Sequence, residues 1–374
     1  MNRYPESWKD LRIVLSHDWL TGMRGGERVL EVLCDGFPSA PVFSLIHKRG
    51  TVSPAIESHS ITTSPLQHVP GIFRFYRHFL PLFPAAVSAM KIPSADLLIS
   101  TSHCAAKGLN ARGAKHLCYC FTPMRYAWTF YEEYFGANRL KRAVVSPILR
   151  AMRAWDRRNS ERVDLFVTLS RHVQQRIKDF YGRDSEVVYP PVNTDFFTPG
   201  GERARAFDLI VSALVPYKRV DLAVRAYTRL GFPLRIVGTG TEFERLRSSA
   251  GPGIEFMGWQ SDETVRDLYR TCRCLVFPGE EDFGIVPVEA QACGCPVVAF
   301  ARGGALESVA EGVSGVFFAQ QTEESLLEAV AKCDQLRWDA QAIRKNAERF
   351  SAQAFVDGMA RCIRKCLAGR SQPR

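Results

Sequence analysis

The 374-residue sequence lacks any run of eighteen apolar residues, the length that a membrane-spanning helix requires. Residues 1–12 are polar and lack the apolar core of a secretory signal, so we expect a cytoplasmic protein. The chain also lacks an internal repeat at the ~20–50-residue periods of solenoid proteins. Hydrophobic residues nevertheless make up 46% of the sequence, and this composition with this length predicts two globular domains.

Three signatures of common binding sites are missing. No Asp-x-Asp pair occurs, so we expect no metal requirement and no other cofactor. No G-x-G-x-x-G follows the first strand, which argues against a nicotinamide site. The net charge is +10, but no zinc-finger or RNA-binding signature accompanies it, so nucleic acid is not an expected partner. Lipid headgroups or diphosphates fit this charge better.

The eleven cysteines form an odd number and recur at a spacing of two residues. The pairs with this spacing are Cys118/Cys120, Cys272/Cys274 and Cys293/Cys295. On a strand, such a spacing places both thiols on one face, too close for a normal disulfide, and it does not match zinc knuckles. We expect buried, reduced thiols.

The most informative stretch is residues 278–299, with the sequence PGEEDFGIVPVEAQACGCPVVA. Its pattern predicts a Pro-Gly turn after a strand, a helix opening near Pro287, a stop at Gly294 and another buried strand. Gly284 before the helix allows a ligand to approach the free N–H groups of the first turn, which form an anion site. Glu281 and Glu289 flank that site and can accept hydrogen bonds from vicinal hydroxyls. Phosphate plus hydroxyls indicates a sugar nucleotide, although an acidic surface loop before a core helix fits the spacing equally well.

Each half of the chain opens with strand, loop and helix. In the first half a strand at 11–16 leads to Gly25 and Gly26, and a strand at 96–101 ends before His103. The second half restarts with a strand at 207–214. The other strands that we expect are at 40–46, 56–62, 117–121, 164–169, 234–240, 253–258, 273–277 and 296–300, and the basic residues 139–182 are otherwise helical.

Two aromatic stretches have open interpretations. In residues 68–90, aromatics alternate with cations, as in interfacial membrane segments, but a core helix with snorkelling arginines has the same pattern. The string T-P-M-R-Y-A-W contains Arg125, which can bind a phosphate, and Tyr126 and Trp128, which can stack on sugars. The alternative is an aromatic loop that packs on the core.

The stretch E-D-F-G-I-V-P-V-E-A-Q-A-C-G-C-P-V-V-A resembles the signature of the retaining family-4 glycosyltransferases. The resemblance implies that Glu281 contacts the transferred sugar and Glu289 the nucleotide ribose. It also implies that Phe283, Gly284 and Ile285 offer backbone N–H groups to the donor.

The fold implied by this resemblance is GT-B, with two Rossmann-like α/β domains facing a central crevice. The expected domains are 1–195 for the acceptor, 196–352 for the nucleotide sugar, and a helix at 353–374 that crosses back to the first domain. By the same resemblance Gly25 and Gly26 close on the donor diphosphate, and His103 contacts the donor sugar.

Lys218 matches the Lys of the family's phosphate-binding Arg-x4-Lys, but Ala213 stands where the Arg belongs. We expect the adjacent Arg219 to supply the second charge. The expected catalytic residues are Glu281, His103 and Lys218. The T-P-M-R-Y-x-W string is similar to bacterial surface-polysaccharide mannosyltransferases, which places Arg125, Tyr126 and Trp128 on the acceptor side.

The resemblance therefore implies transfer of a hexose with retention, first of all mannose from GDP-mannose, in polysaccharide assembly. The expected acceptor is a saccharide or a polyprenyl-diphosphate-linked saccharide at the inner leaflet, where the enzyme would be peripheral. One alternative is another nucleotide sugar with a soluble acceptor. The other is a non-catalytic, basic binding protein that keeps the fold.

Overall fold

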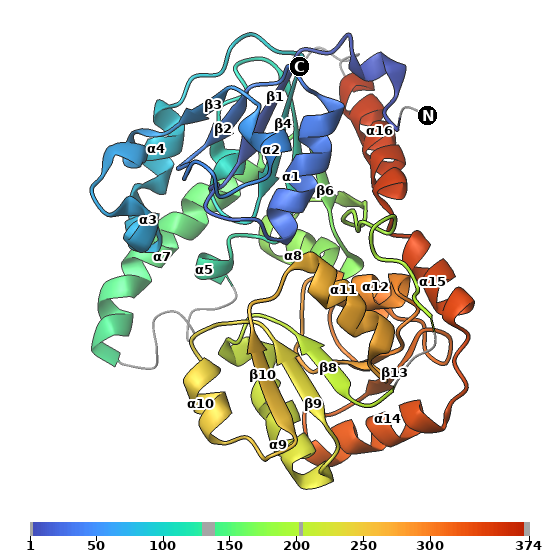
Figure 1. Cartoon of the computed structure of the whole chain (residues 1–374). Coiled ribbons are helices and arrows are strands. Elements are labelled where there is room, and N and C mark those ends of the chain that lie inside the picture. Colours follow the sequence, from blue (N-terminus) through green and yellow to red (C-terminus); the bar gives the residue numbers. More distant parts are fainter. Residues whose placement is uncertain (1–2, 129–138, 202–204, 370–374) are drawn as a thin grey trace. The chain divides into compact units, whose positions relative to one another are not determined.

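The computed structural model describes residues 3–128, 139–201 and 205–369 (Figure 1). In the helix that begins at Arg139, the side chains are described from Ser146 onward. The chain forms two compact units. The first is Met1–Pro191 with Phe355–Arg374, and the second is Val192–Ala354. The predicted divisions were after residues 195 and 352.

The first unit is built on a parallel sheet whose order, over the described residues, is β3-β2-β1-β4-β5-β6-β7. Its strands are β1 (Ile13–His17), β2 (Val42–Ser44), β3 (Ile61–Thr63), β4 (Leu97–Ser102), β5 (Lys115–Cys120), β6 (Leu165–Thr168) and β7 (Ser185–Val187). The central strands β1 and β4 are buried along their length, although each begins apolar and ends in polar residues, because helices cover both faces of the sheet.

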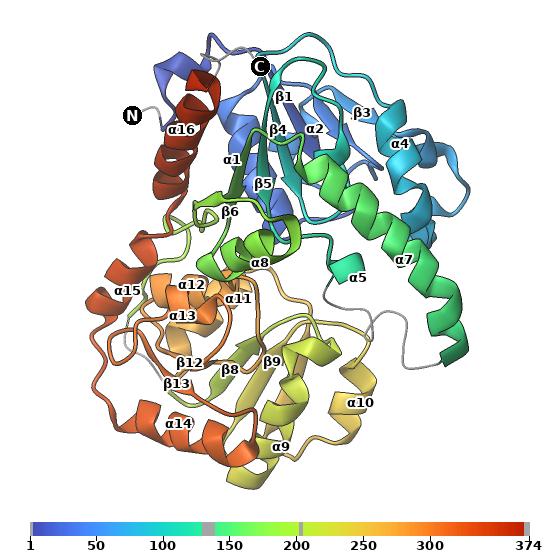
Figure 2. The same ribbon diagram turned by 180° about the vertical axis from the view of Figure 1, so that it is seen from behind.

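Helix α1 lies on one face of this sheet, and α4 and α7 lie on the other (Figures 1 and 2). The α-helices of this unit are α1 (Gly25–Gly36), α2 (Pro54–Glu57), α3 (Ile72–Phe75), α4 (Phe83–Ala89), α5 (Arg125–Trp128), α7 (Arg139–Ser160), α8 (Arg171–Tyr181) and α16 (Ala352–Ala368). Short 3-10 helices are η1 (Glu6–Trp8), η2 (Pro65–His68), η3 (Tyr76–Leu82) and η4 (Ala106–Gly108).

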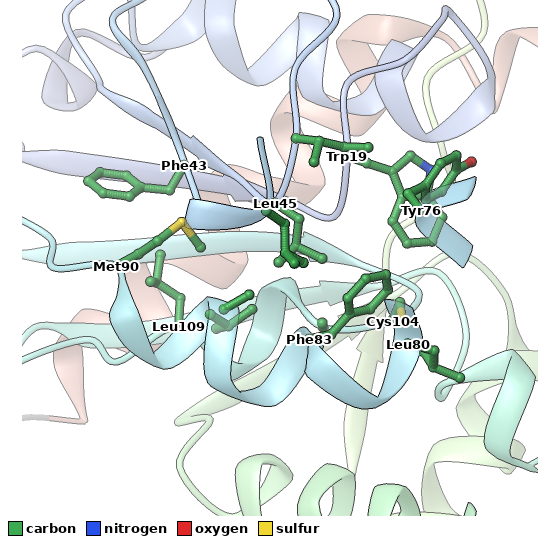
Figure 3. Packing of buried hydrophobic residues seen from close by; sticks show 14 of the residues in the cluster. Trp19, Phe43, Leu45, Tyr76, Leu80, Phe83, Met90, Cys104 and Leu109 are labelled. Carbon is green, nitrogen blue, oxygen red and sulfur yellow. The ribbon is translucent and has the colours of Figure 1, made fainter. Parts of the chain in front are cut away.

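The core on the α4 side joins the sheet to the irregular segment 65–90. Figure 3 shows Phe43 and Leu45 from the sheet side facing Phe83 and Met90, with Trp19 beside them. All five side chains are buried. The segment is divided into α3, η3 and α4. Pro81 lies inside η3, where it interrupts regular helix hydrogen bonding, and Pro84 lies in the first turn of α4, which a proline favours.

Helix α16 packs against the first sheet from Phe355 onward. The Phe355 ring lies 5.7 Å from that of Tyr119 on β5. A Cβ at Gly358 would come within 2.7 Å of Val188, so the glycine permits a close approach there. The prediction that the last helix returns to the first domain is confirmed.

The second unit contains a parallel sheet with the order β10-β9-β8-β11-β12-β13 across the described residues. Its strands are β8 (Asp208–Val211), β9 (Leu234–Val237), β10 (Ile254–Gly258), β11 (Leu275–Phe277), β12 (Val297–Phe300) and β13 (Gly315–Phe318). Its helices are η5 (Pro216–Lys218), α9 (Val220–Leu230), α10 (Phe243–Ser248), α11 (Asp262–Thr271), α12 (Ile285–Ala292), α13 (Ala305–Ser308), α14 (Glu323–Gln335) and α15 (Ala340–Glu348). Helices α9 and α14 pack together over one apolar cluster, and α11 and α12 contact each other.

One strand prediction is wrong in part. Residues 56–62 were expected to be a strand, but α2 occupies Pro54–Glu57 and only β3, Ile61–Thr63, pairs with the sheet. Pro54 supplies a helical first-turn residue, which local apolar spacing did not reveal. The eleven cysteines are free and buried, as predicted. Within the described residues, no helix has the length and apolarity to cross a membrane.

Candidate functional site: two charged pairs at the strand-order reversals

In each sheet the order of the strands changes direction at the first strand of that unit, and the candidate site residues lie on the loops at this point. In the first unit β1 neighbours both β2 and β4, and in the second unit β8 neighbours both β9 and β11. Loops leaving the carboxyl ends of strands diverge at such a reversal and leave room for a ligand. The loops concerned follow β1 and β4 in one unit, and β8 and β11 in the other.

Asp18, directly after β1, organises the loop that carries His103. Its buried carboxylate accepts hydrogen bonds from the backbone N–H groups of residues 103–106, at 2.6–2.9 Å. Its Oδ2 also lies 3.0 Å from Nδ1 of His103. Burial acts to raise the pKa of Asp18, but the charge and hydrogen bond of His103, with the backbone donors, hold it well below its usual value.

His103 is held in one orientation by these contacts. Because a carboxylate can only accept, Nδ1 carries the proton toward Asp18, and Nε2 is the nitrogen that can contact a ligand. The ring of Trp19 meets the His103 ring edge-on at 4.5 Å. The imidazole is 28% exposed. The structure therefore places the predicted His103 at the strand-order reversal, with a fixed tautomer.

A second histidine, His17 at the end of β1, lies beneath the glycine loop. The hydroxyl of Thr101 donates to the carbonyl of Ser16, so it accepts a hydrogen bond from Nδ1 of His17 at 2.8 Å. Nε2 of His17 then faces the buried carboxylate of Glu27 at 3.8 Å. Burial acts to raise the pKa of Glu27, but the hydrogen bond and charge of His17 lower it.

Gly25 and Gly26 form the first turn of α1. A Cβ at Gly26 would lie 3.3 Å from the Phe121 ring and 3.4 Å from His17, so a side chain here would crowd both neighbours. The backbone of the predicted donor loop is thus pressed against the strand ends, one residue away from Glu27.

A buried ion pair fixes the other side of the His103 loop. Lys107 pairs with Asp156 of α7 at 2.5 Å and donates to the carbonyl of Cys104 at 3.0 Å. Burial acts to lower the pKa of Lys107, but the charge of Asp156 raises it above its ordinary value. Asp156 also accepts hydrogen bonds from Trp128 at 2.8 Å and Tyr181 at 2.7 Å.

The predicted acceptor loop is packed. Tyr126 is 8% exposed and belongs to the core cluster, whereas the Trp128 ring stacks on Phe180 at 4.9 Å. The guanidinium of Arg153 lies 5.7 Å from the Trp128 ring. This environment matches the interpretation that the loop packs on the core. The role of Arg125, Tyr126 and Trp128 in acceptor binding stays a prediction.

In the second unit, Lys218 and Glu281 come together at the strand-order reversal. They belong to the loops after β8 and β11, and their side chains form an ion pair that is only partly exposed. A Cβ at Gly279 would come within 2.9 Å of the Lys218 backbone, so this glycine permits the two loops to touch. An ammonium and a carboxylate are thus placed side by side at this reversal, and both are partly exposed.

Arg219 has a different set of partners. It adopts the left-handed conformation, with φ of 53°, and is the N-cap of α9. Its guanidinium contacts Asp221 at 3.3 Å and donates to Gln321 at 2.8 Å. The amide of Gln321 in turn donates to the carbonyl of Pro278 at 3.0 Å. Gln321 therefore connects the two loops of the site, and phosphate binding by Arg219 stays a prediction; Ala213 is exposed on the β8 loop.

The glycine before α12 has the backbone that the sequence indicated. Gly284 has φ of +85° and is the N-cap of α12, which begins at Ile285. Phe283 is buried, with its ring 5.4 Å from that of Phe350, so it anchors the turn. Glu289 lies one turn into the helix and accepts a hydrogen bond from Tyr269 at 3.2 Å.

Sequence reasoning missed four parts of this arrangement. Asp18, Glu27 and Gln321 were not assigned roles, although a carboxylate directly after a strand, as in Asp18, is a readable signal. The contact of the Gly303-Gly304 loop with the site was also missed: Gly304 donates to the carbonyl of Glu281 at 2.8 Å and holds its backbone. Among the described residues, no cluster of three His, Cys, Asp or Glu could hold a metal ion.

Comparison with known proteins matches both halves of the chain. Residues 23–196 match the family model "Glycosyltransferase Family 4", and residues 196–350 match "Glycosyl transferases group 1". An uncharacterized glycosyltransferase of Methanocaldococcus jannaschii is 26% identical over 207 residues, which are 54% of this chain and 58% of the relative. The D-inositol 3-phosphate glycosyltransferase of Mycolicibacterium smegmatis is 39% identical over 152 residues, 35% of either chain.

The chain thus matches little more than half of the length of one of these relatives, and about a third of the other. The similarity to solved structures covers more of the chain. The Anabaena protein HepE, solved in complex with UDP and glucose, has a TM-score of 0.70 and 18% identity. The match covers 95% of this chain and 99% of HepE, which confirms the predicted GT-B fold.

Proposed function

Because both of its halves match glycosyltransferase family models, we propose that the chain is a family-4 glycosyltransferase that transfers a hexose from a nucleotide sugar to a saccharide acceptor. The single observation that carries this proposal is the ion pair of Lys218 with Glu281 at the strand-order reversal of the second unit. A sugar diphosphate has the complementary groups, because its phosphates attract the ammonium and its hydroxyls donate to the carboxylate.

Four groups of the second unit would bind the donor. Lys218 would move from Glu281 to the diphosphate, while the N–H groups at the start of α12 would receive a phosphate or sugar oxygen. Glu281 would then accept from a hexose hydroxyl, and Glu289 from the ribose. Support for this comes from the left-handed Gly284, which brings bare backbone to the helix start, and from the position of Glu289 one turn inside.

We propose retention at the anomeric carbon by a front-face route. The bond from the anomeric carbon to the leaving phosphate oxygen breaks, and the acceptor oxygen bonds to the same face. The acceptor proton passes to the leaving phosphate oxygen. Lys218 stabilises the charge on the departing diphosphate, and no metal ion is needed. His103, held by Asp18, would contact the donor sugar through Nε2.

The donor of first choice is GDP-mannose, because the T-P-M-R-Y-x-W string resembles mannosyltransferases of surface-polysaccharide assembly. UDP-glucose is the alternative donor, since HepE was solved with UDP and glucose. The proposed acceptor is a saccharide or a polyprenyl-diphosphate-linked saccharide at the cytoplasmic face of the inner membrane. A protein that binds nucleotides without catalysis is the remaining alternative.

A donor panel tests this function. GDP-mannose, UDP-glucose, UDP-galactose and ADP-glucose are incubated with the full chain, and release of nucleoside diphosphate is followed with and without saccharide acceptors. We expect one donor to be consumed, and Lys218→Met to slow its consumption strongly. Binding of a nucleoside diphosphate by calorimetry without turnover of any donor would favour the binding-protein alternative.

A further inference from the structure

An exposed apolar patch lies on the first unit in residues 72–82. Eight large hydrophobic side chains are exposed among the described residues, and three of them are in this stretch of eleven residues. They are Phe73, Phe75 and Leu82, with exposed fractions of 39%, 46% and 50%. Such clustering on one short segment indicates an interaction surface, whereas single exposed apolar residues do not.

The segment has two faces because α3 and η3 are helical over this stretch. Ile72, Tyr76 and Leu80 point into the core and are buried, and Figure 3 shows Tyr76 and Leu80 at this edge of the cluster. Phe73 and Phe75 alternate with these residues and face solvent. The inward face therefore anchors the segment, and its outward aromatics are not needed to fill the core.

The charge of the segment has one sign. No Asp or Glu occurs between Glu57 and Asp96, and the charged residues of this interval are Arg74, Arg77 and Lys91. All three are exposed. The Arg74 guanidinium lies 5.2 Å from the centre of the Phe75 ring, so cation and aromatic surface are presented together.

The segment is also in contact with the candidate site. The ring of Tyr76 lies 5.0 Å from that of Trp19, and Phe83 lies 6.3 Å from it. Trp19 also contacts the ring of His103, edge-on at 4.5 Å. One side chain therefore separates the anchored face of the segment from the site of the first unit.

We propose that residues 72–82 dock this protein onto the surface of an anionic lipid bilayer. Phe73, Phe75 and Leu82 enter the interface, and Arg74 and Arg77 contact lipid phosphates. Arginine beside aromatic side chains suits the boundary between headgroups and acyl chains. The positive charge without acidic residues selects anionic lipid over neutral lipid. This inference goes beyond the proposed transfer reaction, and it does not depend on the identity of the donor.

Vesicle flotation tests the proposal directly, with the full chain and without nucleotide. The vesicles contain phosphatidylcholine alone or with about one third phosphatidylglycerol. We expect the protein to float with the anionic vesicles at low salt, and to remain at the bottom with neutral ones. Phe73→Ser/Phe75→Ser/Leu82→Ser should bind at least about tenfold more weakly.

Two further variants guard against a folding artefact. Arg74→Gln/Arg77→Gln keeps the apolar side chains and should weaken binding and its salt dependence. Leu230→Ser/Trp259→Ser removes exposed apolar side chains from the second unit and should float like the original protein. The proposal is overturned if the original protein does not float with anionic vesicles, or if neither segment variant weakens binding. Flotation without donor turnover would leave the docking standing and contradict the proposed transfer.

Discussion

Nδ1 of His103 lies 3.0 Å from Oδ2 of Asp18, and this pair joins the loops that follow the first and fourth strands of its sheet. In the second unit Lys218 and Glu281 join the loops after the first and fourth strands of their own sheet. Each domain thus places one ion pair at the reversal of its strand order. The two carboxylates differ in burial, since the side chain of Asp18 is fully enclosed and that of Glu281 is 22% exposed.

Asp18→Asn should destabilise the first unit by about 3–5 kcal/mol at pH 7, because it uncouples four backbone donors and His103 from a buried charge. The pKa of Asp18 is lower in the folded than in the unfolded protein. Its ionised carboxylate therefore contributes fully to the free energy of unfolding above the unfolded carboxyl pKa of about 3.9, and this contribution is lost as the pH falls toward the folded-state pKa. Urea unfolding between pH 2 and 8 measures this. The difference from the original protein should be constant from pH 5 to 8 and shrink below about pH 4.

The control is Asp10→Asn, at an exposed carboxylate, which should change stability by less than about 0.5 kcal/mol. A stability difference for Asp18→Asn that stays unchanged down to pH 2 would contradict the assigned charge of this carboxylate.

Glu281→Ala should abolish sugar transfer and leave binding of the nucleoside diphosphate nearly intact. Lys218→Met should weaken both, with a loss of about 2–4 kcal/mol in transition-state stabilisation. Calorimetry with GDP and UDP, together with donor turnover, separates the two effects. If Glu281→Ala lost nucleotide binding as well, the assignment of Glu281 to the sugar and Glu289 to the ribose would be wrong.

Gln321→Leu should raise the KM for the donor more than it lowers kcat, because Gln321 connects Arg219 to the Pro278 carbonyl and so sets the spacing of two donor loops. We expect a change of about tenfold in kcat/KM, or about 1.4 kcal/mol. Gln320→Leu, at the exposed neighbouring position, is the matched control and should be silent. Equal effects of the two variants on kcat/KM would contradict a positioning role of Gln321.

Lys107→Met should cost about 3–5 kcal/mol of folding stability, because Asp156 would remain charged and buried without its partner. Lys107→Met/Asp156→Leu should recover part of this loss, although Trp128 and Tyr181 also lose an acceptor. Arg229→Ala, which breaks an exposed ion pair with Glu324, should cost less than about 1 kcal/mol. Thermal unfolding compares the variants, and a double variant less stable than both single ones would contradict this account.

Chelation should leave the reaction unchanged. The sequence has no Asp-x-Asp, and Lys218 with the helix start of α12 is proposed to stabilise the leaving diphosphate. Donor turnover measured with EDTA, and again after adding Mg²⁺ or Mn²⁺, checks this expectation. Loss of turnover with EDTA and its recovery with Mn²⁺ would contradict it.

The sequence predicted the local elements of the site well, because local patterns determine them. Gly284 before a helix and Gly294 after it are readable from turn chemistry, and both have positive φ in the structure. Contacts between residues that are far apart in the sequence were harder to predict. Lys218 and Glu281 are far apart along the chain, and only the strand order that places β8 beside β11 brings their loops together.

Residue types were a weaker guide to exposure. Tyr126 had two open interpretations, a ring that stacks on a sugar or a residue of the core. The structure buries it in the core, and nothing in the string T-P-M-R-Y-A-W shows which side faces the sheet. Asp18 was overlooked beside His17, since its partners lie about 85 residues further on. Residues 68–90 had two interpretations that the sequence left open, and within them residues 72–82 have both a buried face and an exposed one in the structure.

The central claim is that Lys218 and Glu281 hold the diphosphate and the hexose of a nucleotide sugar. A crystal structure of the chain with its preferred, unhydrolysed donor measures this most directly. The account predicts the diphosphate within hydrogen-bonding distance of the Lys218 ammonium, and a hexose hydroxyl donating to Glu281. A donor bound elsewhere, with the Lys218–Glu281 ion pair intact, would contradict it.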